Sequence, residues 1–134
     1  MRAREDLTAV LEAEPHVRLA VLFGSAAAGR LRARSDIDLA ILLDDASAMT
    51  PQVSAALSRA AGRQVDVILL HNAPPLLRFE IARTGVVLIE RVPHAWADFR
   101  ARAMIDWWDW APTARMMHAV AASRLREVAD RGTA

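Results

Sequence analysis

Three aspartates interrupt apolar runs that otherwise have the pattern of buried strands. Asp36 and Asp38 open the run DIDLAILL, and Asp66 lies in VDVILL. Because side chains alternate along a strand, Asp36 and Asp38 are expected on one face, roughly 7 Å apart, with Ile37 and Leu39 pointing into a core. Carboxylates in such surroundings repel each other and are costly to desolvate, which favours a cation beside them. Three acids on neighbouring strands suit a hard divalent ion such as Mg²⁺, which binds oxygen ligands and keeps positions open for substrate phosphates.

Gly24 and Ser25 follow an apolar run over residues 17–23 that is typical of a strand buried on both faces. A Gly-Ser pair between a strand and a helix directs backbone N–H groups and a hydroxyl at a bound anion. Taken alone, the pair is an ordinary turn, and Asp36 and Asp38 could belong to an edge strand with one solvated face. Together, the pair and the aspartates favour a loop that holds the phosphates of a nucleotide.

Basic side chains gather between this loop and the aspartates. All 17 basic residues of the chain are arginines, and Arg30, Arg32 and Arg34 form a local cluster. The planar guanidinium group suits bidentate contact with phosphate. Arg30 and Arg34 are therefore the expected triphosphate contacts, with a solvated basic face as the alternative.

The elements that position these residues alternate between strands and helices. Apolar runs predict strands over 17–23, 36–43, 65–70 and 86–90. Helical spacing of apolar residues predicts helices over 4–14, 50–61 and 76–83, and from residue 94 two helical segments separated near Pro112. The alternation is typical of an α/β fold with helices packed on a small mixed sheet, and 134 residues suffice for one domain.

Composition narrows the classes of function. The absence of cysteine rules out disulfides and cysteine-ligated metals and fits a reducing cytosol. The first residues contain acids and no long apolar run, so neither a signal peptide nor a membrane span is expected and the protein is expected in the cytoplasm. A formal net charge of +1 provides no strong field toward nucleic acid.

Three tryptophans fall within four residues of the helical tail: Trp107, Trp108 and Trp110. On a helix they point around more than half of the circumference, so one packing face cannot bury them all. The remaining aromatic surface favours a partner interface, since tryptophan concentrates binding energy. The alternative is that both tail helices wrap the domain tightly. Met116, Met117 and Val120 are expected in the core.

The order Gly24-Ser25, ten intervening residues, Asp36-Ile37-Asp38 and a later strand aspartate at Asp66 resembles the signature of the DNA polymerase beta type nucleotidyltransferase superfamily. The short length resembles its smallest members, the minimal nucleotidyltransferases. The resemblance implies one polymerase-beta-like domain over residues 1–134, with a nucleotidyltransferase core over about 1–92 and a helical tail over about 93–131.

The resemblance also implies roles for individual residues. Asp36 and Asp38 would hold two Mg²⁺ ions that grip the triphosphate of ATP, and Asp66 would help to position the metal near the acceptor hydroxyl and accept its proton. Gly24 and Ser25 would bind the β- and γ-phosphates. Ser35 would contact phosphate, or else be a plain hydroxyl at the entry to a strand.

Minimal nucleotidyltransferases of this kind are commonly antitoxins that transfer AMP from ATP onto a tyrosine of a HEPN-domain ribonuclease toxin. The resemblance therefore implies a magnesium-dependent protein adenylyltransferase with a cognate HEPN toxin as its partner, acting without direct nucleic acid or membrane contact. Two alternatives remain. The same aspartates could modify a small molecule such as an aminoglycoside, or the chain could neutralise a toxin by steric masking alone.

Overall fold

The computed structural model describes residues 2–27 and 36–132. Its centre is a four-stranded mixed sheet in the order β3-β2-β1-β4. The strands are β1 (Val17–Phe23), β2 (Ile37–Leu43), β3 (Val65–Leu69) and β4 (Val86–Glu90). β1 pairs antiparallel with β2 and with β4, whereas β2 and β3 are parallel. The predicted α/β fold with a small mixed sheet is thus confirmed.

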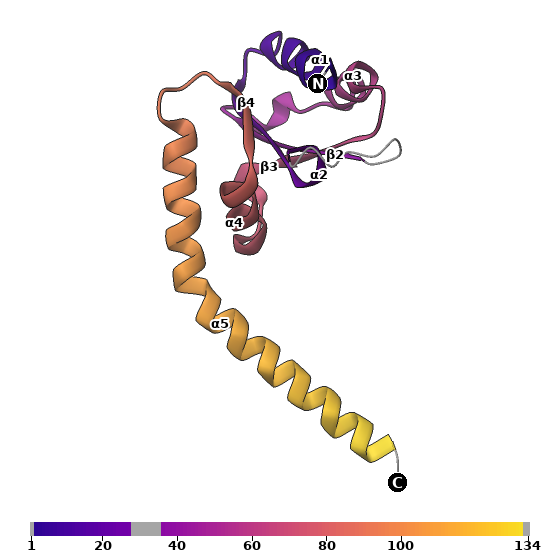
Figure 1. The fold of residues 1–134 in the computed structure, drawn as a ribbon, viewed down its shortest axis with the longest axis vertical. Helices are drawn as coiled ribbons and strands as arrows, with labels where there is room; N and C mark the ends of the chain where they lie inside the picture. The colour runs from indigo at the N-terminus through magenta and orange to yellow at the C-terminus, as the bar shows by residue number, and fades with distance from the viewer. Residues whose placement is uncertain (1, 28–35, 133–134) are drawn as a thin grey trace.

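Helices cover both faces of this sheet. The helices are α1 (Arg2–Glu12), α2 (Gly24–Ala27), α3 (Pro51–Ala61), α4 (Pro75–Thr84) and α5 (Ala95–Gly132), with short 3-10 turns η1 (Ala46–Ala48) and η2 (Leu70–Asn72). Figure 1 shows α1 and α3 together on one side of the sheet and α4 on the other. One buried cluster joins α1 and α3 to the sheet, and a second joins α4 and the start of α5 to its opposite face.

The central strands explain why their sequence is almost continuously apolar. In β1 every residue except Arg18 is buried, and in β2 only Asp38 and Leu42 are partly accessible. A strand that has neighbours on both sides and helices on both faces exposes almost no surface, so it needs apolar residues at both alternations. The predicted bounds of β1 are confirmed, whereas β2 begins at Ile37, so Asp36 precedes the strand and does not belong to it.

The connection from β2 to β3 runs through α3, whose ends were predicted from sequence. The Thr50 hydroxyl accepts a hydrogen bond from the Val53 N–H, Pro51 occupies the first turn, and Gly62 ends the helix in the left-handed conformation at φ +69°. The threonine accepts from a free N–H group of the first turn, the proline has no N–H group that would need a partner there, and the glycine adopts the conformation that ends the helix. Together they fix where β3 begins, and with it the position of Asp66.

The tail differs from expectation, because residues 95–132 form the single helix α5 with Pro112 inside it. Proline lacks an N–H group and its ring crowds the carbonyl of the residue four positions earlier, here Trp108, so it bends a helix without having to end it. Figure 1 shows that α5 changes direction partway along and that its second half extends away from the sheet. The predicted break near Pro112 is therefore a bend within one helix.

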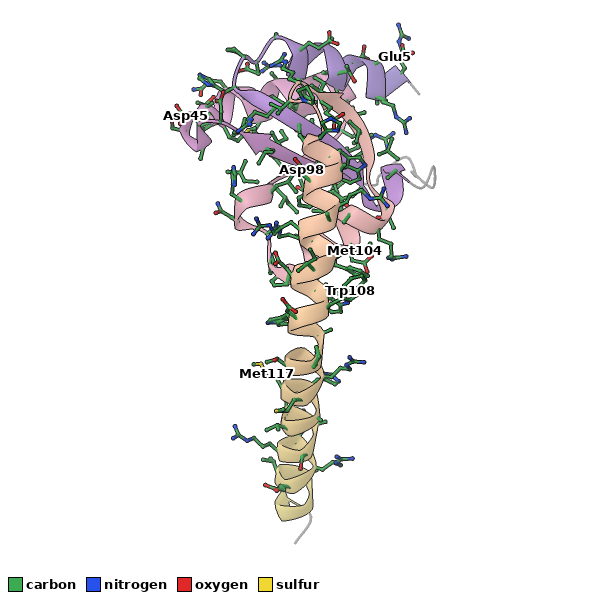
Figure 2. All side chains as sticks on the ribbon, turned by 90° about the vertical axis from the view of Figure 1, so that its left-hand side faces the viewer. Glu5, Asp45, Asp98, Met104, Trp108 and Met117 are labelled. Atoms are coloured by element: carbon green, nitrogen blue, oxygen red, sulfur yellow. The ribbon has the colours of Figure 1, made fainter. Side chains whose placement is uncertain are left out.

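The second half of α5 also corrects the prediction that Met116, Met117 and Val120 belong to the core. Their side chains are 67%, 63% and 45% exposed, because this part of the helix leaves the domain. Figure 2 shows Met117 on a length of helix that stands clear of the other elements. Helical spacing of apolar residues identifies a face that needs a partner, but not whether the partner belongs to the same chain.

The tryptophan cluster follows the prediction that one face cannot bury all three rings. Trp107 stacks on Phe79 of α4 with ring centroids 5.1 Å apart, while Trp108 is 69% exposed and Trp110 38% exposed. Large aromatic surface therefore remains on α5. None of the described helices combines the length and the apolar character needed to cross a bilayer.

Candidate functional site

Strand pairing brings Gly24, Asp38 and Asp66 together at one end of the sheet. Phe23, the last residue of β1, is the antiparallel partner of Asp38, and Asp38 is the parallel partner of Asp66. Gly24 follows Phe23 directly and opens α2. The two aspartates thus lie side by side on neighbouring strands, with the β1–α2 turn beside them.

Both strand aspartates lie on the face of the sheet that α4 covers. Ile37 and Leu39 pack in the cluster beneath α1 and α3, as do Val65 and Val67. Because side chains alternate along a strand, the residues between them, Asp38 and Asp66, project from the opposite face. The prediction that Asp38 points away from Ile37 and Leu39 is confirmed, whereas strand alternation does not place Asp36, which precedes β2.

Gly24 lies so close to Asp38 that no side chain fits there. Its φ is +68°, in the left-handed region that glycine adopts readily. A Cβ atom at this position would lie 2.7 Å from the Asp38 Oδ2 atom, well inside normal contact. Glycine therefore keeps open the space between the backbone of the turn and the carboxylate.

The carboxylates influence one another electrostatically. Burial first, and then the negative charges of Asp66 and Asp36, raise the pKa of Asp38 above its ordinary value of 3.8. Asp38 is half-buried, whereas Asp36 and Asp66 are exposed. Like charges this close destabilise the ionised form of the most buried member. A cation placed among them would remove that repulsion.

The chemistry of the three side chains fits a hard divalent cation, since all donors are carboxylate oxygens and two of the three are open to solvent. Their geometry is less complete. Over residues 2–27 and 36–132, no three histidine, cysteine, aspartate or glutamate side chains are arranged so that they already enclose one ion. The carboxylates are therefore neighbours with space between them, but they do not form a preorganised metal site.

Gln64 is a polar neighbour of the site that sequence reasoning missed. Its Nε2 atom lies 3.4 Å from the Asp66 Oδ1 atom, as a long hydrogen bond. A residue two positions before a strand aspartate lies on the same face of the strand, but a glutamine at that position is ordinary and gave no signal of its own. A groove lined by Gln64 and Asp66 also includes Thr50, Pro51 and Ser54, which the sequence alone could not bring together.

Several predicted phosphate contacts lie outside the described part of the chain. Arg30, Arg34 and Ser35 fall there, as does the side chain of Ser25. Their roles therefore stay predictions. The backbone of Ser25 lies in the first turn of α2, immediately after Gly24.

Comparisons with known proteins agree with this geometry. Residues 5–94 match the model of the family "Polymerase beta, Nucleotidyltransferase". Protein adenylyltransferase MntA from Aphanizomenon flos-aquae (strain 2012/KM1/D3) is 27% identical over 115 residues, which cover 77% of each chain.

Solved structures share the fold. A toxin–antitoxin crystal structure with AMP-PNP contains a chain that matches with a TM-score of 0.74 at 23% identity, over 87% of this chain and 97% of that one. A second structure, of a tri-AMPylated Shewanella oneidensis HEPN toxin in complex with MNT antitoxin, matches with a TM-score of 0.70 at 21% identity, over 90% and 98%.

Proposed function

The chain belongs to the polymerase beta nucleotidyltransferase family, and on that premise we propose that it is a magnesium-dependent adenylyltransferase antitoxin. It transfers AMP from ATP to a tyrosine hydroxyl of a cognate HEPN ribonuclease toxin. The observation that carries the proposal is the pairing of Asp38 with Asp66 beside Gly24. The relatives support the choice of nucleotide and acceptor, because one is a protein adenylyltransferase and others are toxin–antitoxin structures with AMP-PNP or an AMPylated toxin.

The reaction is an in-line displacement at the α-phosphorus of ATP. The acceptor hydroxyl oxygen forms a bond to this phosphorus, the bond from phosphorus to the oxygen that bridges to the β-phosphorus breaks, and pyrophosphate leaves. The hydroxyl proton passes to the carboxylate of Asp66, which is exposed and so open to an incoming acceptor. Gln64 holds one oxygen of that carboxylate and leaves the other for the proton.

Asp36, Asp38 and Asp66 would hold the magnesium ions, two by analogy with the family. Bound magnesium would neutralise the carboxylates and stabilise the charge on the attacking and leaving oxygens. The triphosphate would lie against the backbone N–H groups of Gly24 and Ser25 at the start of α2. Arg30, Arg34 and Ser35 are proposed as further phosphate contacts.

A protein partner is supported by the apolar surface of α5. Five large side chains after Pro112 are 45% to 70% exposed: Met116, Met117, Val120, Leu125 and Val128. We name this apolar surface of α5, together with the exposed side chains of Trp108 and Trp110, the α5 face. So many large apolar side chains exposed on one helix indicate an interaction site. We propose that the α5 face binds the HEPN toxin in a hetero-complex in the cytoplasm, without direct contact to nucleic acid.

The test is intact-mass analysis of the proposed HEPN partner. Incubation with this protein, ATP and magnesium should add one or more AMP groups to the partner. The double variant Asp36→Ala with Asp38→Ala should add none. Neutralisation of the toxin by that double variant would overturn catalysis in favour of masking. Modification of a small hydroxyl compound in place of the partner would favour the small-molecule alternative.

A further inference from the structure

Strand β3 is an edge of the sheet, with β2 on one side and no described strand on the other. An edge strand presents backbone N–H and C=O groups that can pair with another extended chain. Beside this edge runs a groove of about 490 Å³. Asp66 and Val67 of β3 line it, together with Met49, Thr50, Pro51 and Ser54 from outside the strand.

The direction of the β3 backbone groups follows from a hydrogen bond to β2. The Gln64 carbonyl accepts from the Ile37 N–H at 2.9 Å, so the backbone N–H and C=O groups of Gln64 are directed toward β2. The direction of the backbone groups alternates along a strand, so those of Asp66 also face β2, whereas those of Val65 and Val67 face the open edge. The Val65 N–H already donates to the Ser58 Oγ atom at 3.2 Å. Val67 is therefore the residue whose backbone faces the groove beside Asp66.

The groove chemistry suits a polypeptide and not a nucleic acid. Among the described residues, its lining combines apolar side chains, short hydroxyl groups and one amide; Asp66 is the only charged residue among them, and none of them is basic. These residues offer no countercharge to the phosphates of a polynucleotide. An extended peptide has backbone N–H and C=O groups that can form hydrogen bonds with the Val67 backbone, and its apolar side chains can contact Met49 and Pro51.

We propose that the segment carrying the acceptor hydroxyl enters as an extended strand that pairs with β3 at Val67. The inference rests on the proposed function and adds how the acceptor reaches the site. A residue opposite Asp66 on such a strand would project from the same face as Asp66, with Cβ atoms about 4.5 to 5.5 Å apart. Strand pairing therefore brings the hydroxyl-bearing residue to the carboxylate that takes its proton.

Amide hydrogen exchange of the wild-type protein tests the pairing without relying on activity. The protein is mixed with the HEPN partner and α,β-methylene-ATP, whose methylene bridge prevents transfer. The Val67 amide should exchange about tenfold more slowly than in the protein with the nucleotide analogue alone. Amides of β4, the opposite edge of the same sheet, serve as the control and should not change.

Two outcomes would overturn the pairing. Protection confined to α5 would mean that the partner docks without adding a strand. Protection of Val67 by an oligoribonucleotide in the absence of the HEPN protein would mean that the groove takes nucleic acid.

A proline variant provides an independent measurement. Val67→Pro removes the N–H that faces the groove, and an edge position tolerates proline better than a central one. The kcat/KM for the protein acceptor should fall about tenfold or more, while binding of α,β-methylene-ATP with magnesium is retained. Val87→Pro, the same change on the other edge strand, is the matched control, and melting curves establish that both variants fold.

These results separate the two proposals. If wild-type protein adds no AMP to the partner, the proposed function fails. If it adds AMP, and Val67→Pro adds it as fast while the Val67 amide stays unprotected, only the strand pairing fails.

Discussion

At the scale of single residues, Asp38 and Gly24 have features that do not contribute to the stability of the fold. Asp38 is half-buried beside two further carboxylates, and this raises its pKa. Gly24 has a positive φ and leaves no room for a Cβ atom. Neither feature stabilises the sheet. Local departures from the most stable choice are common where a protein binds or reacts.

Asp38→Asn should stabilise the protein in metal-free buffer at neutral pH, by about 0.5 kcal/mol, because it removes a repulsion that solvent partly screens. Because the pKa of Asp38 is raised in the folded protein, folding favours the protonated carboxyl. In the wild-type protein the stabilising contribution of this protonated group is present below the unfolded-state pKa and is lost as the pH rises through the folded-state pKa. The gain should therefore grow with pH across that range and vanish in acid.

Chemical denaturation at several pH values measures this gain. Asp109→Asn, at an exposed aspartate of α5, is the control. Magnesium added to wild-type protein should reverse the order by raising its melting temperature above that of Asp38→Asn. A variant that is less stable than wild type at pH 7 without metal would contradict the account of Asp38.

Gly24→Ala should lose most AMP transfer, since its Cβ atom would meet the Asp38 Oδ2 atom at 2.7 Å. Gly62→Ala is a matched control, because Gly62 has nearly the same φ but a Cβ atom added there would meet no other atom within 4 Å. Both variants should lose about 1 kcal/mol of stability from backbone strain. Only Gly24→Ala should weaken binding of α,β-methylene-ATP with magnesium, as measured by calorimetry. Equal effects of the two changes on nucleotide binding would count against the site.

The residues of the site were predictable where their type conflicts with their surroundings. Asp38 and Asp66 are acids within buried-strand patterns, and Gly24 ends such a pattern, so each was visible in the sequence. Gln64 was not, because a glutamine at a strand entry is ordinary. Asp36 was assigned to the strand, but its backbone precedes the pairing with β3, and local patterns rarely fix an element end to one residue.

At the scale of elements, prediction succeeded for strands that are buried on both faces of the sheet and for a helix whose ends carry capping residues. The strands are apolar runs of limited length, and α3 has Thr50, Pro51 and Gly62 at its ends. The tail was predicted as two helices because proline usually marks a boundary. Whether proline ends or bends a helix depends on the residues around it, and those after Pro112 are good helix formers such as alanine, methionine and arginine.

Pro112→Ala should straighten α5 and stabilise it, since proline in a helix interior costs about 3 kcal/mol relative to alanine. The chain contains no cysteine, so spin labels can be placed only where cysteine is introduced. Labels at Arg102→Cys and Leu125→Cys should lie farther apart in Pro112→Ala than in the parent, by pulsed electron resonance. Pro93→Ala, outside the helix, should leave the distance unchanged. A distance unaltered by Pro112→Ala would mean that proline does not cause the bend.

At the scale of the whole molecule, the acidic end of the sheet and the exposed apolar surface of α5 are separate features, which we propose to be a reaction site and a docking surface. Asp38 and Asp66 lie at one end of the sheet, whereas the second half of α5 extends away from the sheet (Figure 1). The sequence predicted exposed aromatic surface at the tryptophans but placed Met116, Met117 and Val120 in the core, because apolar residues at helical spacing look the same whether they cover their own domain or a partner. The structure shows that Met117, Leu125 and Val128 do not cover their own domain.

Met117→Asp with Leu125→Asp should weaken the complex with the HEPN protein about tenfold or more, since charges would replace apolar contacts at the centre of the α5 face. The melting temperature of the isolated chain should barely change, because neither side chain packs on the domain. Glu5→Lys, at an exposed residue of α1 away from this face (Figure 2), is the control. Binding measured by calorimetry that survives the double change would place the partner elsewhere.

The most direct test of the account is the single-turnover rate of AMP transfer by Asp66→Asn to the HEPN protein, measured with α-labelled ATP and magnesium. If Asp66 accepts the proton of the acceptor hydroxyl beside Asp38, the rate should fall by about 10²-fold to 10⁴-fold. The complex with the partner should still form. Transfer by Asp66→Asn at the wild-type rate would contradict the central claim that Asp38 and Asp66 form one catalytic site.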